Sequence, residues 1–157
     1  AAYTIERPLH LGAALAGAGD SLIDAFRGYG RDIGIAFQLR DDLLGVFGDP
    51  AVTGKPAGDD IREGKRTELF ATALELLDQA DPGAEQELRD GIGSTEDEAE
   101  LRRLAALIRS SGAEDAVEAR IEELTASGLG FLAGAGINDA AVEALTVLAH
   151  KATDRRM

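Results

Sequence analysis

The chain has 157 residues and a mass of 16.4 kDa, the size of one ordinary domain. It carries 16 basic and 29 acidic residues, and the formal net charge of −13 argues against nucleic-acid binding, which needs a basic surface. With no Cys and only 2 His, disulfides, thiolate zinc sites and a His-rich metal centre are excluded. The absence of Cys also fits a reducing compartment, and no apolar run approaches the roughly 20 residues of a membrane span, so we predict a cytoplasmic protein that is not integral to a membrane.

Helical periodicity dominates the sequence, and no segment shows the apolar–polar alternation of a strand. We predict an all-α protein in which residues 1–157 form a single helical region. Helices are expected over residues 9–18, 21–47 and 66–80, after Asp81, after a Thr95 cap, and after an Asn138 cap. Apolar residues wrap most of the 21–47 helix, which indicates a place in the middle of a helical bundle.

Residues 48–65 (GDPAVTGKPAGDDIREGK) form the one long stretch without helical periodicity. Compact domains rarely keep such a loop unless it has a function or is disordered. We therefore predict an irregular active-site loop here.

Three polar side chains lie near the end of the 21–47 helix, just before this loop. Gln38 precedes Asp41 by three residues and Asp42 by four, so all three can share one helix face. Ionised carboxylates near a helix C-terminus oppose the helix dipole, so the acid pair requires a positive partner. Mg²⁺ is the natural candidate, because it prefers oxygen ligands and retains waters and phosphate oxygens.

The loop supplies charged groups that suit a phosphate ligand. Lys55 lies in the Gly-rich part, and Asp59, Asp60 and Lys65 follow it. A lysine on a Gly-rich loop can bind a phosphate as a point charge. The acid pair, the loop and the lysines together predict a Mg²⁺–diphosphate clamp, although the sequence contains no P-loop.

The segment FQLRDDLLGVFGDPAVTGKPAGDDIREGKRT, residues 37–67, resembles the second aspartate-rich region of the trans-isoprenyl diphosphate synthases, or polyprenyl synthetases. The shared pattern is FQ, two residues, a DDxxD-like motif, FGD, GK and a D-I-x-x-x-K sequence. The resemblance extends back through residues 1–36, where YT, PLHLGA and YG match the family. The remainder of the chain is compatible with the family but carries no signature.

The resemblance implies an all-α isoprenoid synthase fold and Mg²⁺-dependent condensation of isopentenyl diphosphate with an allylic diphosphate, giving geranyl, farnesyl, geranylgeranyl or longer diphosphates. It also implies a homodimer. By position it assigns metal binding to Asp41, Asp42 and Asp60, contact with the allylic substrate to Phe37 and Gln38, contact with diphosphate to Lys55 and Lys65, and catalytic roles to Asp41, Asp42 and Lys55.

Two departures from the family pattern qualify this expectation. The fifth position of DDxxD is Gly45, and the first aspartate-rich motif is absent from the chain. We therefore interpret the chain as the C-terminal half of a synthase, catalytically incomplete alone, which associates with the other half or with a second copy. The alternative is a non-catalytic small subunit that modulates a full-length synthase.

Overall fold

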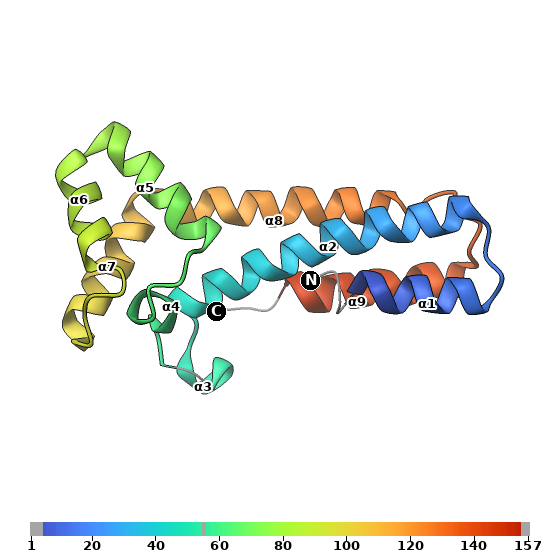
Figure 1. The fold of residues 1–157 in the computed structure, drawn as a ribbon, viewed down its shortest axis with the longest axis horizontal. Coiled ribbons are helices and arrows are strands. Elements are labelled where there is room, and N and C mark those ends of the chain that lie inside the picture. The colour runs from blue at the N-terminus through green and yellow to red at the C-terminus, as the bar shows by residue number, and fades with distance from the viewer. Residues whose placement is uncertain (1–4, 55, 155–157) are drawn as a thin grey trace. The chain divides into compact units, whose positions relative to one another are not determined.

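The computed structural model describes residues 5–54 and 56–154, and this part of the chain is helical without any strand. The all-α prediction is confirmed. The helices are α1 (Arg7–Leu15), α2 (Asp20–Phe47), α3 (Pro50–Thr53), α4 (Asp59–Arg62), α5 (Glu68–Ala80), α6 (Pro82–Gly91), α7 (Glu98–Ser110), α8 (Ala113–Gly130) and α9 (Asp139–Thr153), as labelled in Figure 1. No helix in the described residues is both long and apolar enough to cross a membrane.

Side-chain caps fix where several of these helices begin. The carboxylate of Asp81 and the side-chain oxygen of Asn138 accept backbone N–H groups of the first turns of α6 and α9, at 3.1 and 2.8 Å, as predicted. The predicted Thr95 cap is wrong. Asp97 takes that role by accepting the Glu100 N–H at 3.0 Å, while the Thr95 hydroxyl accepts the N–H of Asp97 outside the helix.

The 48–65 segment is less irregular than its sequence indicates, because it contains α3 and α4. Asp49 caps α3 by accepting the Ala51 N–H at 2.8 Å, and Gly54 ends that helix with φ +70°. Gly58, with φ +75°, precedes α4. Single helical turns carry too few residues to show a period in the sequence, so the pattern could not predict them.

Backbone contacts divide the helical chain into two compact units. Of the described residues, 5–40 and 120–154 form unit 1, and 41–54 and 56–119 form unit 2. The boundaries fall inside α2 and α8, so each of these helices contributes residues to both units.

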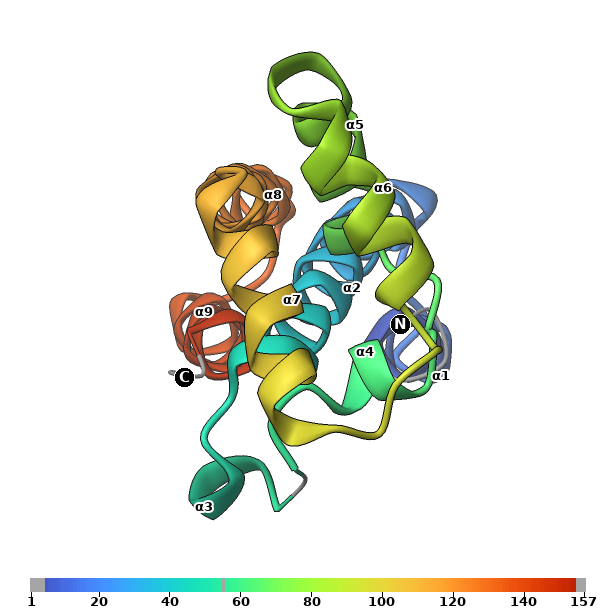
Figure 2. The same ribbon diagram turned by 90° about the vertical axis from the view of Figure 1, so that its left-hand side faces the viewer.

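Unit 1 is a bundle of α1, the first part of α2, the second part of α8, and α9. Figure 1 shows these helices side by side, and Figure 2 shows them end on with α2 between α1 and the α8–α9 pair. Its core contains Ala13, Phe26, Tyr29, Ile33, Leu132 and Ala149. Two hydrogen bonds join α2 to α9. The Tyr29 hydroxyl donates to the Leu145 carbonyl at 2.7 Å in a half-buried position, and Arg40 Nε donates to the Thr153 carbonyl at 2.7 Å in a buried one.

Unit 2 contains the end of α2, helices α3 to α7 and the start of α8. Helix α6 packs against α5 and α7, and α4 packs against α7. Its fully buried side chains include Leu43, Ile61, Leu69, Leu88, Leu101, Leu104 and Ile108. Each unit therefore buries apolar side chains of its own.

Candidate functional site

A cluster of two carboxylates and one ammonium group lies in unit 2. Lys65 Nζ donates to Asp60 Oδ2 at 2.8 Å and to Asp42 Oδ1 at 3.2 Å. Both acids are 4 % exposed, whereas the Lys65 side chain is 39 % exposed. The structure thus brings three predicted residues together, although Asp42 and Asp60 are far apart in the sequence.

Gly45 explains how Asp60 can reach this position. A Cβ atom at position 45 would overlap all three atoms of the Asp60 carboxylate. The space that a side chain at the fifth position of DDxxD would fill is therefore occupied by Asp60. The departure from the family pattern at Gly45 leaves room for an acid from α4 against the same turn of α2.

A backbone contact between two glycines holds the loop that carries Lys65. Gly64 and Gly93 have φ values of +63° and +73°, and a Cβ on either one would lie 3.1 or 3.0 Å from the Cα of the other. The Gly93 N–H also donates to the Ile61 carbonyl at 2.8 Å. Only residues without a Cβ can approach this closely in the left-handed region. The loop between α6 and α7 thereby supports the segment between α4 and Lys65.

The charge of Lys65 is stabilised by its acidic partners. Partial burial alone would lower the pKa of the Lys65 amine, but hydrogen bonds and charge from Asp60 and Asp42 outweigh burial and raise that pKa above its ordinary value. Lys65 is therefore an ammonium ion at neutral pH. The α2 acids are expected to need a positive partner, with Mg²⁺ as the candidate, and Lys65 supplies part of that positive charge at Asp42.

The donors suit a hard divalent ion that brings further ligands with it. Carboxylate oxygens are the ligands that Mg²⁺ prefers, and the Asp60 carboxylate fills the space of an absent side chain beside α2. Within residues 5–54 and 56–154, no group of three or more acids or histidines is arranged to hold a metal by itself. These residues fit a Mg²⁺ ion whose remaining ligands are water and substrate oxygens.

Three other predicted residues, Phe37, Gln38 and Asp41, lie on α2 within five residues before Asp42. Asp41 is half-buried on α2 directly before Asp42, and Gln38 is exposed one turn earlier. Phe37 lines a mostly apolar cavity of about 310 Å³ in unit 1, together with residues that include Leu9, Tyr29, Ile33, Leu145 and Leu148. Lys55 lies outside the described residues.

The sequence analysis did not identify two features of this site. Gly45 was noted as a missing acid, although its function here is to admit Asp60. Gly93 was not considered, because it lies outside the 37–67 motif. The Gly–Ile–Gly sequence at residues 91–93 was the available signal, since glycine-rich breaks mark positions of positive φ or close backbone approach.

The chain is similar to known prenyl diphosphate synthases. The polyprenyl synthetase family model matches residues 1–108. A geranylfarnesyl diphosphate synthase of Aeropyrum pernix is 43 % identical over 116 residues, which cover 74 % of this chain and 35 % of that enzyme. A (2E,6E)-farnesyl diphosphate synthase of Mycobacterium bovis is 38 % identical over 147 residues, which cover 93 % of this chain and 41 % of the relative.

Solved structures extend the similarity to the fold. The geranylgeranyl pyrophosphate synthase of Corynebacterium glutamicum, complexed with isoprenyl diphosphate and magnesium, matches with a TM-score of 0.95 and 56 % identity, covering 99 % of this chain and 43 % of that one. A polyprenyl synthase of Caulobacter crescentus, complexed with calcium and isoprenyl diphosphate, matches with a TM-score of 0.83 and 36 % identity, covering 98 % and 46 %. The chain belongs to the polyprenyl synthetase family and has the isoprenoid synthase fold. It spans less than half the length of these relatives.

Proposed function

We propose that this chain supplies a metal- and diphosphate-binding part of a trans-prenyltransferase, which condenses isopentenyl diphosphate with an allylic diphosphate. The observation that carries the proposal is the convergence of buried Asp42 and Asp60 on Lys65, beside Asp41 on α2. The magnesium and isoprenyl diphosphate in the Corynebacterium glutamicum complex support the same chemistry. The relatives are named as synthases, so the comparisons do not favour a non-catalytic small subunit.

Each residue has a distinct role in this proposal. Asp41, Asp42 and Asp60 hold Mg²⁺ directly or through water, and Lys65 pairs with both buried acids and faces the diphosphate. Lys55 binds the allylic diphosphate, while Phe37 and Gln38 contact the allylic substrate one turn earlier on α2. When bound, Mg²⁺ would stabilise negative charge that develops on the departing diphosphate.

The proposal extends to partners and location. We expect the chain to act in the cytoplasm and to associate, as a homodimer or with the remaining part of a synthase, rather than to catalyse condensation alone. Leu11 and Leu15 on α1 are 66 % and 89 % exposed, which supports association through an apolar face.

Thermal unfolding with Mg²⁺, a non-hydrolysable diphosphate analogue, or both tests the site. With both ligands at about 100 times their dissociation constants, we expect the melting temperature to rise by roughly 5–10 °C. Each ligand alone should give much less, because each completes the binding site of the other.

Variants distinguish ligand binding at this site from nonspecific attraction of Mg²⁺ to the acidic surface. Asp42→Asn and Lys55→Ala should remove the joint effect. Glu122→Gln is the matched control, since Glu122 is an exposed acid of α8 outside the cluster. An undiminished joint effect in Asp42→Asn, or an equal rise with Mg²⁺ alone, would contradict the proposal.

A further inference from the structure

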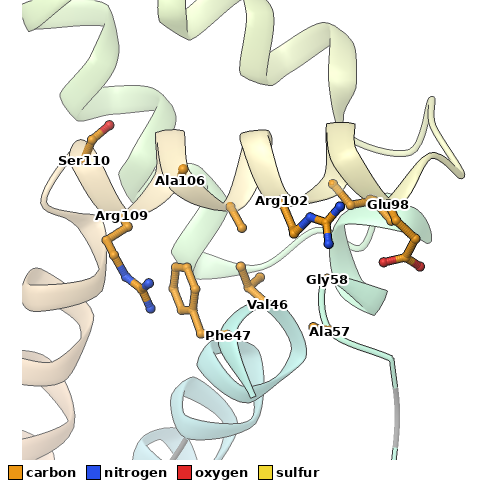
Figure 3. A pocket seen from close by; sticks show the side chains of 11 residues that line it. Val46, Phe47, Ala57, Gly58, Glu98, Arg102, Ala106, Arg109 and Ser110 are labelled. Atoms are coloured by element: carbon orange, nitrogen blue, oxygen red, sulfur yellow. The ribbon is translucent and has the colours of Figure 1, made fainter. Parts of the chain in front are cut away.

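A second cavity lies in unit 2, apart from the acids that the proposed reaction uses. It has a volume of about 570 Å³ and lies among the end of α2, residues 57–58 and α7 (Figure 3). Small-molecule sites occupy about 300–1,000 Å³, so the cavity can hold an organic ligand. Asp42, Asp60 and Lys65 are not among the residues that line it.

The lining is apolar on two sides. Val46 and Phe47 of α2 lie opposite Ala106 of α7 (Figure 3), and Leu101 and Ala105 of α7 also line the cavity. The small alanine side chains leave the space between the two helices open. An aliphatic chain placed here would bury part of its surface against these side chains, which favours binding.

Three charged side chains also line the cavity, and two of them already have partners of opposite charge. Glu98 Oε1 accepts a hydrogen bond from Arg62 Nη2 at 3.0 Å. Arg109 Nε donates to Glu114 Oε2 at 2.6 Å, and its guanidinium lies 4.6 Å from the centre of the Phe47 ring. Arg62 also pairs with Asp59 at 3.2 Å and with Glu96 at 3.3 Å, so Glu98 receives only a share of its charge, whereas Arg109 is paired with Glu114.

Arg102 differs from the other two charged residues. Among residues 5–54 and 56–154 it makes no hydrogen bond or ion pair with another residue. It lies seven residues before Arg109, so both project from the same face of α7, which Figure 3 shows turned toward Val46 and Phe47. The lining contains two arginines and one glutamate, so its own side chains carry a net positive charge in a chain whose net charge is −13.

We infer that this cavity binds an amphipathic anion, with the anionic head on Arg102 and the apolar chain between Val46 and the alanines of α7. Guanidinium groups bind phosphate and carboxylate heads through charge-assisted hydrogen bonds. A prenyl diphosphate and a fatty acid both have this chemistry. The inference does not depend on the proposed metal site.

Two residues that line the cavity lie just before Asp60 in the sequence, so the cavity and the acid cluster share one segment of the chain. Ala57 and Gly58 line the cavity, and Gly58 immediately precedes α4, which carries Asp60. A ligand that contacts Gly58 therefore touches the segment that positions Asp60. We expect ligand binding to alter the environment of the Asp60 amide as well as those of the lining residues.

Amide NMR titration with EDTA present tests the inference. A fifteen-carbon prenyl diphosphate and a fatty acid of similar length should each shift the amides of Gly58, Arg102 and Ala106. Inorganic diphosphate and the neutral prenol should bind at least tenfold more weakly, since each lacks half of the recognised chemistry. Response to only one of the two amphiphiles identifies the ligand source and also supports the inference. Because magnesium is absent, failure of the proposed metal site would not change this result.

Two variants and a control locate the interaction. Arg102→Gln should weaken binding at least tenfold by removing the charge, and Ala106→Phe should do the same by filling the cavity. Arg103→Gln is the matched control, because Arg103 pairs with Glu87 at 2.6 Å and does not line the cavity. Unchanged binding in both variants, equal binding of the neutral prenol, or shifts that do not cluster at the cavity would overturn the inference.

Discussion

At the scale of single residues, Gly45 and Asp60 depend on each other. Asp60 is buried and is paired with Lys65, and it reaches that place because position 45 has no side chain. A buried carboxylate is costly unless it is paired, so displacing Asp60 from Lys65 would expose the full cost of its burial. Gly45 is thus a structural requirement of the acid cluster.

Gly45→Ala tests this requirement. The new methyl group overlaps Asp60, and we expect a net loss of about 1–3 kcal/mol in unfolding free energy, together with a weaker joint effect of Mg²⁺ and diphosphate. Gly130→Ala is the control, since Gly130 is also helical but has open space around its Cβ position. Urea denaturation should show Gly130→Ala unchanged or slightly stabilised. Equal behaviour of the two variants would contradict the steric account.

Residues within one contiguous motif could be predicted from the sequence, whereas contacts between distant segments could not. Asp41, Asp42 and Lys65 were identified because spacing along 37–67 carries their pattern. The pairing of Asp42 with Lys65 and the packing of Asp60 on Gly45 depend on where α4 folds back on α2, which no local period records. Long helices such as α2 were predicted almost to the residue, but the single turns α3 and α4 were missed.

At the scale of elements, the glycine pair Gly64 and Gly93 joins the loop before Lys65 to the connection between α6 and α7. Gly93→Ala should strain the backbone at φ +73° and also push its Cβ against the Gly64 Cα. Gly112→Ala is a matched control, because Gly112 has φ +85° but no atom within 4 Å of its Cβ position.

We expect Gly93→Ala to be less stable than Gly112→Ala by about 1–3 kcal/mol in urea denaturation, since only Gly93 adds a steric clash to the shared strain. Gly93→Ala should also reduce the stabilisation by Mg²⁺ with diphosphate, because Lys65 directly follows Gly64. If the two variants lose equal stability and keep equal ligand responses, the glycine contact does not position Lys65.

The hydrogen bond between Tyr29 of α2 and Leu145 of α9 predicts that the free energy of unfolding depends on pH. Burial raises the pKa of Tyr29 to about 12, above the ordinary value of about 10, and its hydroxyl donates to the Leu145 carbonyl. The unfolded chain therefore loses this proton at lower pH than the native protein does. The contribution of Tyr29 to stability is complete below pH about 10 and falls as pH rises toward 12.

Tyr29→Phe should lower the unfolding free energy by about 1 kcal/mol at neutral pH, because the hydrogen bond is lost. The difference between wild type and variant should shrink, and can reverse, as pH rises from about 10 to 12. Urea denaturation across this range measures it. A difference that stays constant with pH would contradict the assignment.

At the scale of the whole molecule, the chain has a strong negative net charge, and the proposed metal site is one cluster of acids among many. A net charge of −13 attracts divalent cations everywhere on the surface, so metal binding alone is weak evidence for a site. What distinguishes the proposed site is the prediction that metal and diphosphate bind together at Asp41, Asp42 and Asp60. A decisive measurement must therefore report both location and dependence on diphosphate.

Paramagnetic broadening of amide NMR signals by Mn²⁺ meets both conditions, because Mn²⁺ shares the preference of Mg²⁺ for oxygen ligands. With a diphosphate analogue present, we predict broadening centred on Asp41, Asp42 and Asp60, and its loss in Asp42→Asn. Without the analogue, broadening at these positions should be much weaker. Broadening centred instead on the acidic residues 96–100, or unaffected by the analogue, would contradict the assignment of the cluster as a metal–diphosphate site.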